Sequence, residues 1–445
     1  MKRLLAIALV ATTLSGYSQP LSYPISATGQ TICYDEQGRV MKKLKEGDKL
    51  YGQDGNYLSG NKMSFKVNGN GTVSDLGTGL MWQQIPPAEG TTWQQAKEYC
   101  ENLELGGYDD WRLPTLKELF SISNFEEGWP YLDLKVFSLA GDIISKDQQY
   151  WADNKYVGET AQGRDNAAFG VNHVTGHIKA YPAGGERGEG GRPQQGGRPP
   201  QGGGDGQMTQ GGRPPQGGQG GQGGRPPQGG QGGQGGQMAQ GGGRPPQGGG
   251  QGGGQGGGRP MGNPMAKQVR AVRGEVYGVN KFVVNGDGTI SDLATGLMWA
   301  QSDNGEGVEW ITALPYGEAS TLAGYSDWRL PNVKELQSIV DYSRAPSSRG
   351  VEAAIDPIFS CTPMVNEAGD DDYGYYWTST SACFTKGRPH YFAWYVAFGR
   401  AVNNQGKDFH GAGAVRFDSK ANNGTPVEGG EERYLNLVRL VREIK

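Results

Sequence analysis

Short runs of alternating apolar and polar residues recur along the chain and predict strands. Phe65, Val67 and Val73 flank an Asn-Gly-Asn-Gly segment, which is typical of a tight β-hairpin turn. Two aromatic runs late in the chain, Tyr375–Ser379 and Tyr391–Phe398, have the composition of strands. The pattern therefore favours a protein built largely from short strands.

The hairpin pattern occurs twice. Residues 65–84 read FKVNGNGTVSDLGTGLMWQQ and residues 282–301 read FVVNGDGTISDLATGLMWAQ, so 15 of 20 positions are identical at an offset of 217. The same offset relates the two DWRLP motifs, at residues 110–114 and 327–331. A fixed offset over this length predicts two copies of one domain.

Helical periodicity is confined to short segments of each copy. Trp93, Ala96, Cys100 and Leu103 recur every three or four residues, so they predict one face of a helix that a preceding threonine caps. In copy two, Pro315 falls within the matching segment, and we expect that helix to be shorter or kinked.

A second helix in each copy is predicted by a capping box. Thr115 is followed three residues later by Glu118, and Asn332 by Glu335. Two helices followed by an irregular, strand-rich half predict an α+β domain.

A Gly-rich segment separates the start and the end of copy one. The closing VRAVR at Val269–Arg273 matches VRLVR at Val438–Arg442 at an offset of only 169, so copy one is 48 residues longer than copy two between its DWRLP motif and its closing strand. Residues 184–264 contain 38 of the 78 glycines, a composition that cannot build a packed core. Their spacing breaks the every-third-glycine rule of collagen. We therefore predict a disordered Gly/Pro/Gln-rich loop inserted in copy one.

The predicted organisation has five parts. Residues 1–18 have the positive start and apolar stretch of a signal peptide, so the mature protein is expected to be exported, to the cell surface, the medium or the periplasm. Residues 19–60 form a leader segment. The first domain spans residues 61–274, interrupted by the insertion at 184–264, and the second spans residues 275–445.

Charge and hydropathy exclude two classes of protein. The net charge is −4, and outside residues 184–264 it is −8, which argues against a nucleic-acid binder. No apolar run reaches the roughly 20 residues of a membrane-spanning helix.

The four cysteines of an exported chain are expected to form disulfides. Cys361 and Cys383 flank an aromatic stretch and form the first candidate pair, which leaves Cys33 and Cys100 to tie the leader to the following domain. The three possible connectivities stay open.

The combined motifs resemble one family. NGDGTxxDxxTGLMW, a Trp-x-x-Ala helix, DWRLP with a following Glu-Leu, a YYWTS strand and a final VRxVR resemble the Lcl C-terminal-domain family, named for a bacterial collagen-like adhesin. The segments at residues 28–35 and 52–57 are similar to that family's leader. At a greater distance, the WxxAxxYC helix followed by RLP resembles formylglycine-generating enzymes and the C-type-lectin-like fold. The resemblance implies two compact domains with irregular ligand-binding loops.

Copy two carries the residues that we expect to bind a ligand. An acidic run lies beside aromatic residues that copy one lacks, and carboxylates next to exposed rings suit calcium or sugar binding. The candidate ligand-binding residues are Asp370, Asp371, Asp372, Tyr373, Tyr375, Trp394 and Tyr395. On a strand Trp394 and Tyr395 point in opposite directions, so we expect at least one to face away from the core. Replacing the three aspartates by alanine is expected to abolish binding and to leave the melting temperature nearly unchanged.

Most other conspicuous residues have a structural interpretation. The repeated tryptophans (82, 93, 111, 299, 310 and 328) are expected in the core. Arg112 and Arg329 are expected to pair with Glu118 and Glu335. The Asn/Asp-Gly hairpins could hold calcium, but they lack the closing glutamate of an EF-hand.

A histidine pair, His173 and His177, is also expected not to bind a metal, because Gly176 and its neighbours disfavour a helix there. We therefore assign no residues to a metal site and name no cofactor. Calcium is the one ion that stays open.

The sequence thus favours a secreted or surface-exposed binding protein, not an enzyme, with an extracellular glycan or a surface protein as its partner. The namesake of the family implies sulfated glycans, but the acidic folded parts favour neutral sugars or a protein. A structural or assembly protein of the cell envelope is the alternative. An oxidase similar to formylglycine-generating enzymes would require Cys361 and Cys383 to be free and close together.

Overall fold

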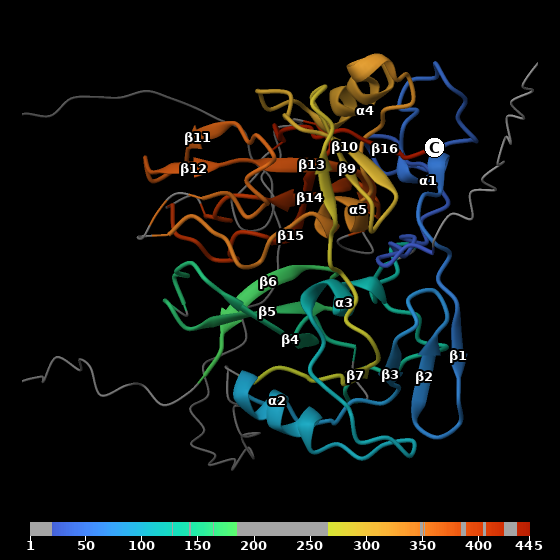
Figure 1. The fold of residues 1–445 in the computed structure, drawn as a ribbon, viewed down its shortest axis with the longest axis vertical. Coiled ribbons are helices and arrows are strands. Elements are labelled where there is room, and N and C mark those ends of the chain that lie inside the picture. Colours follow the sequence, from blue (N-terminus) through green and yellow to red (C-terminus); the bar gives the residue numbers. More distant parts are fainter. Residues whose placement is uncertain are drawn as a thin grey trace, which may run out of the picture. The chain divides into compact units, whose positions relative to one another are not determined.

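The computed structural model describes residues 20–184, 266–421 and 434–445, except residues 127, 142, 143, 163, 348, 349, 351, 384–388, 404 and 405. The predicted signal peptide and all but the first residue of the predicted Gly-rich insertion lie outside the described residues. The described chain is rich in strands, has few helices and consists of two repeated halves (Figure 1).

Each copy opens with a small antiparallel sheet that its own closing segment completes. The strands are β1 (Phe65–Val67), β2 (Thr72–Asp75), β3 (Met81–Gln83) and β7 (Val272–Arg273) in copy one, and β8 (Phe282–Val284), β9 (Thr289–Asp292), β10 (Leu297–Ala300) and β16 (Val441–Glu443) in copy two. Strand β7 pairs with β3, with Met81 opposite Arg273, and β16 pairs with β10, with Met298 opposite Arg442. Because β7 follows the Gly-rich segment, both flanks of that segment belong to copy one.

The second half of each copy contributes to a sheet that both copies share. Its strands are β4 (Gln149–Tyr156), β5 (Ala167–Asn172), β6 (Ile178–Pro182), β13 (Tyr375–Ala382), β14 (Phe392–Ala397) and β15 (Val415–Ser419). In the described chain their order is β13-β14-β15-β6-β5-β4, and the antiparallel pair of Ile178 and Val415 joins the copies (Figure 1). A separate hairpin in copy two consists of β11 (Pro363–Val365) and β12 (Asp371–Tyr373).

The helices are short, and the four longest of the described chain begin where the sequence predicted. They are α1 (Asp54–Tyr57), α2 (Trp93–Glu101), α3 (Leu116–Ser121), α4 (Trp310–Glu318), a 3-10 turn (Leu322–Gly324) and α5 (Val333–Ser338). Thr92 caps α2, and the capping boxes of α3 and α5 are both formed, which confirms those predictions.

The expectation of a shorter helix in copy two was wrong, because α4 and α2 both have nine residues. Pro315 lies inside α4 on its exposed face. The proline removes one N–H from the helix ladder, and the helix nevertheless continues to Glu318.

The repeated tryptophans form the core, as predicted. Trp82, Trp299 and Trp310 are fully buried, and Trp93, Trp111 and Trp328 are at most 8% exposed.

The leader segment contacts copy two as well as the domain that follows it. Asp54 of α1 accepts hydrogen bonds from the hydroxyls of Thr28 and Thr380, both at 2.7 Å. The ring of Tyr34 stacks on His390 at 3.8 Å. The leader is therefore held by contacts with copy two, and the expected disulfide between the leader and copy one is not formed.

The four cysteines are free thiols in the structure, contrary to the predicted disulfides. Cys361 lies 3.4 Å from a guanidinium nitrogen of Arg439, whereas the backbone of Cys383 contacts the hydroxyl of Tyr131. Cys100 is buried in α2 with no exposed surface. None of the four thiols is bonded to another, and the leader is held by hydrogen bonds and ring stacking instead.

Candidate functional site

The acidic run of copy two lies on the β11–β12 hairpin. The side chain of Asn366 closes the turn, because its Oδ1 accepts the backbone N–H groups of Ala368 and Asp370 at 2.9 and 3.2 Å. Its amide also donates to Asp372 Oδ2 at 2.9 Å. Asn366 is thus a local organiser of the hairpin, since asparagine readily bonds to nearby backbone groups.

Asp372 is a buried structural residue, contrary to its expected place in an exposed loop. Its side chain is 1% exposed and accepts hydrogen bonds from Arg400 Nε at 3.1 Å and from the Arg400 backbone N–H at 2.9 Å. The backbone N–H of Tyr373 donates to the same carboxylate. A buried carboxylate needs such partners, so Asp372 joins the hairpin to the end of β14 and does not face a ligand.

The other two aspartates of the run face solvent. Asp370 lies 3.4 Å from Arg400 Nη1 and its side chain is 57% exposed. Asp371 is also exposed, and its carbonyl oxygen accepts a hydrogen bond from Arg400. The acidic run therefore offers two accessible carboxylates, not three.

The expectation that Trp394 or Tyr395 faces away from the core was wrong. Trp394 has no exposed surface and Tyr395 is 5% exposed. The two rings do point to opposite faces of β14, but each face is covered by a different hydrophobic cluster. Tyr375 packs on Tyr395 with ring centroids 5.1 Å apart, and Tyr373 is partly buried. These aromatic residues therefore pack in the interior next to the hairpin.

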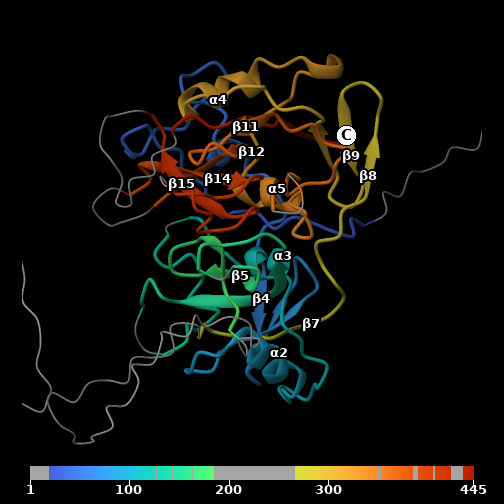
Figure 2. The ribbon, with the colours of Figure 1, turned by 90° about the vertical axis from the view of Figure 1, so that its left-hand side faces the viewer.

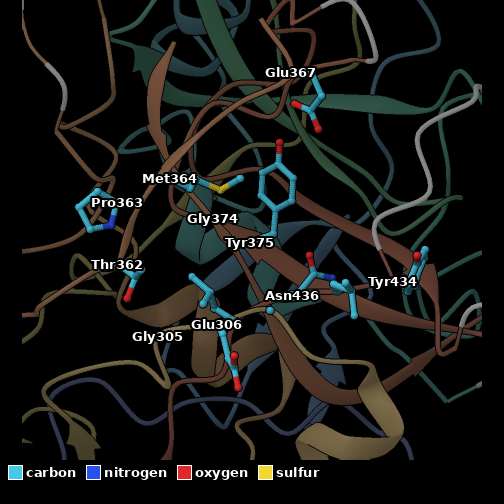
Figure 3. Close-up of a pocket in the computed structure, with 13 residues that line it drawn as sticks. Gly305, Glu306, Thr362, Pro363, Met364, Glu367, Gly374, Tyr375, Tyr434 and Asn436 are labelled. Atoms are coloured by element: carbon cyan, nitrogen blue, oxygen red, sulfur yellow. The ribbon is translucent and has the colours of Figure 1, made fainter. Parts of the chain in front are cut away.

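An open pocket of about 460 Å³ lies beside the hairpin (Figure 3). Met364 and Leu435 provide exposed apolar walls, and the ring of Tyr375 lies at the centre of the view. Glu306 and Glu367 lie on opposite sides of that ring in Figure 3. Sequence reasoning found only Tyr375 of this set. Single glutamates in irregular loops carry no periodic signal, so nothing in the sequence indicated that Glu306 and Glu367 belong to a site.

The Asn/Asp-Gly hairpins use their oxygens internally. Asn68 donates to the hydroxyls of Thr72 and Ser74, and Asp287 accepts the hydroxyl of Thr289 at 2.6 Å. Among the described residues, no group of three or more His, Cys, Asp or Glu side chains is arranged to hold a metal ion.

The histidine pair lies in the turn between β5 and β6, not on a helix. Burial lowers the pKa of both His173 and His177 well below the usual value, so both rings are neutral at ordinary pH.

The predicted Arg–Glu pairs are present in both copies. Arg112 binds Glu118 through two nitrogens at 2.6 and 2.7 Å, and Arg329 binds Glu335 at 2.8 Å. Each glutamate also accepts the N–H of its capping residue. These carboxylates therefore stabilise the start of α3 and α5 and take no part in the pocket.

Comparisons with known proteins identify the repeated unit. Residues 71–188 and 288–417 each match the family model described as the Lcl C-terminal domain. Neither a curated protein nor a solved structure matches the chain. Within the described residues, no helix is both long and apolar enough to span a membrane. The two matched segments cover more than half of the chain, which therefore belongs to the Lcl C-terminal domain family and carries the domain twice.

Proposed function

We propose that this protein is an exported binding or adhesion protein that contacts extracellular polysaccharide through the pocket beside the β11–β12 hairpin. Family membership supports a surface or adhesin-like role. The observation that carries the proposal is the pairing of exposed apolar walls with carboxylates around one open pocket in copy two. We regard each copy as a lectin-like domain.

The chemistry of the pocket suits a neutral sugar. A sugar ring has an apolar face that can pack on Met364 and Leu435, which are 37% and 52% exposed. Its hydroxyl groups can donate hydrogen bonds to the carboxylates of Glu306 and Glu367. Hydrogen bonds to charged groups are stronger than those between neutral groups. The same carboxylates, with Asp371 nearby, repel sulfate groups. The pocket therefore favours neutral over sulfated glycans.

The surroundings of three of the four thiols, including Cys383, support a binding role over catalysis by cysteine. Burial raises the pKa of Cys33 to about 11 and that of Cys100 to about 12. Burial also raises the pKa of Cys383. Since the thiolate is the reactive form, these cysteines are poor nucleophiles at neutral pH.

A glycan array probed with the purified full-length protein, with and without calcium, tests the proposal. The double variant Glu306→Gln/Glu367→Gln should lower binding at least about tenfold, because each lost charge-assisted hydrogen bond is worth about 1.5 kcal/mol or more. Glu89→Gln is the matched control, since Glu89 is the exposed equivalent of Glu306 in copy one. Full binding by the double variant, or equal loss in the control, would contradict a glycan site in this pocket.

A further inference from the structure

Strand β8 is the free edge of the small sheet of copy two. In the described chain the strand order of that sheet is β16-β10-β9-β8, so β8 has a neighbour on one side, and Figure 2 shows β9 on its inner side. The N–H of Asn285 and the carbonyl of Lys281 bond to β9 and to the residue that follows it. Because these bonds alternate along an antiparallel pair, the main-chain groups of Phe282 and Val284 point away from β9.

The outward main-chain groups of β8 have no partner in the part of the chain that the structure describes. No backbone hydrogen bond there involves the N–H or the carbonyl of Phe282 or Val284. An edge of this kind is a template for a further strand. Apolar side chains accompany it, since Val283 is 43% exposed, Val284 48% and Val279 64%. The edge therefore combines unpaired main-chain groups with exposed apolar surface, which is typical of an interaction site.

The equivalent edge of copy one carries a lysine at its centre. At the offset of 217, Lys66 of β1 corresponds to Val283 of β8, and both copies have phenylalanine before and valine after this position. Lys66 is exposed. A lysine on an edge strand is a common means of preventing pairing with another strand. The two edges thus differ at the central position, and β8 has the residue that permits pairing.

A second copy of β8 is the partner that fits this edge, because the strand is complementary to itself. If two β8 strands pair antiparallel about a two-fold axis at Val283, Phe282 of each strand meets Val284 of the other. These residues have the outward main-chain groups, so each pair can exchange both of its hydrogen bonds. The two Val283 side chains then lie opposite each other. In β1 the same arrangement would oppose two Lys66 ammonium groups, which is destabilising.

The charges beside β8 favour the same register. Lys281 lies two residues before Val283, Asp287 lies beyond the end of the strand, and both are exposed. In the two-fold arrangement Lys281 is opposite Asn285 of the second copy and diagonal to its Asp287, within reach of a long side chain. Both ends of the pairing therefore bring an ammonium group close to a carboxylate.

We propose that β8 is a dimerisation edge, which pairs antiparallel with β8 of a second copy of this chain. This inference goes beyond the proposed glycan binding and does not depend on it, because the pocket beside the β11–β12 hairpin shares no residue with β8.

Sedimentation of the full-length protein over a range of concentrations tests the proposal. We expect a concentration-dependent dimer that Val283→Lys weakens at least about tenfold, because the variant opposes two ammonium groups at the centre of the interface. Val67→Lys is the matched control, since Val67 is the equivalent of Val284 on β1 and is 44% exposed. This control should leave dimerisation unchanged.

A cysteine variant keeps the test valid if Val283→Lys misfolds. Opposed residues of a non-hydrogen-bonded antiparallel pair have Cα atoms about 4.5 Å apart, which a disulfide can join. Val283→Cys should therefore give a disulfide-linked dimer under mild oxidation, whereas Val67→Cys and the unmodified protein should not. A monomer at every concentration, a dimer that Val283→Lys leaves intact, a loss caused equally by Val67→Lys, or cross-linking no greater than in the controls would overturn the proposal.

Discussion

At the scale of single residues, burial separates side chains that look alike in the sequence. Asp370, Asp371 and Asp372 form one acidic run, but only Asp372 is buried and fully bonded. Neighbouring residues on a strand point to opposite sides, so a run of identical charges divides between core and solvent. The sequence could not show which aspartate is buried, because Arg400, the partner of Asp372, lies 28 residues further along the chain.

Replacing the whole run by alanine should therefore destabilise the protein, which corrects the expectation of an unchanged melting temperature. Asp372→Ala should lower the free energy of unfolding by about 2–4 kcal/mol, because it leaves Arg400 and Asn366 without their buried acceptor. Asp371→Ala should leave stability nearly unchanged. Urea unfolding of both single variants measures the difference, and equal stability would contradict the structural role of Asp372.

A buried lysine gives the fold a distinct dependence on pH. Burial lowers the pKa of Lys334 from 10.5 to about 7, although Asp75 and Asp54 act in the opposite direction. Between pH 7 and about pH 10 the unfolded chain therefore binds more protons at this position than the folded chain. Stability should rise with pH over that interval, by at most about 1.4 kcal/mol per pH unit for one proton.

Thermal unfolding between pH 7 and pH 9 checks this expectation. The melting temperature of the unmodified protein should rise, and Lys334→Met should reduce the slope while also losing the bonds to Ala27 and Ser121. Lys281→Met is the control, because Lys281 is exposed. A slope that Lys334→Met leaves unchanged would show that another group causes the pH dependence.

At the scale of elements, local signals were sufficient for the four longest helices and for the two Asn/Asp-Gly hairpins, but not for α1, the 3-10 turn or the β11–β12 hairpin. The capping boxes of α3 and α5 and the Asn-Gly turns need only residues close in sequence, and the structure has all of them. The face of α2 was also predictable, since Trp93, Ala96 and Cys100 are buried together. Repetition assigned β7 to copy one, because VRAVR and VRLVR could be aligned, but its pairing with β3 came from the structure.

The pocket and the coverage of β14 could not be predicted in this way. Whether both faces of a strand are buried depends on elements far away in sequence, such as Tyr131, which packs on Trp394. The pocket likewise brings Glu306 and Glu367 together with residues 434–437. Self-comparison assigns equivalent positions in the two copies, but it does not show how the copies pack on each other.

At the scale of the whole chain, the two copies are interdependent. They share one sheet through Ile178 and Val415, and the leader contacts both of them. Lys334 of copy two donates hydrogen bonds to the leader and to copy one. A boundary between the copies therefore marks a repeat in the sequence, and it cuts through a hydrophobic cluster that contains residues of both copies.

The flanks of the Gly-rich segment are fixed side by side, which makes its removal a sharp test of the insertion. The N–H of Trp93 donates to the carbonyl of Ala183, and Thr91 pairs with Lys267, so the two flanks attach to one segment two residues apart. At about 3.3 Å per residue this separation is about 7 Å, which a few residues can span. Deleting residues 188–261 leaves residues 185–187 and 262–265 as the connection.

We expect this deletion to preserve one cooperative unfolding transition and to stabilise the protein slightly. Shortening the closed loop from about 80 to about 10 residues lowers its closure entropy cost by at most about 2 kcal/mol. A chain that also lacks residues 266–273 should lose copy one, because it loses β7 and the buried Arg270, whose guanidinium binds the carbonyls of Gln83 and Gln84. Calorimetry of the two deletions distinguishes these outcomes. If the larger deletion melted like the smaller one, β7 would not be part of the first domain, and the Gly-rich segment would be a linker between two complete copies.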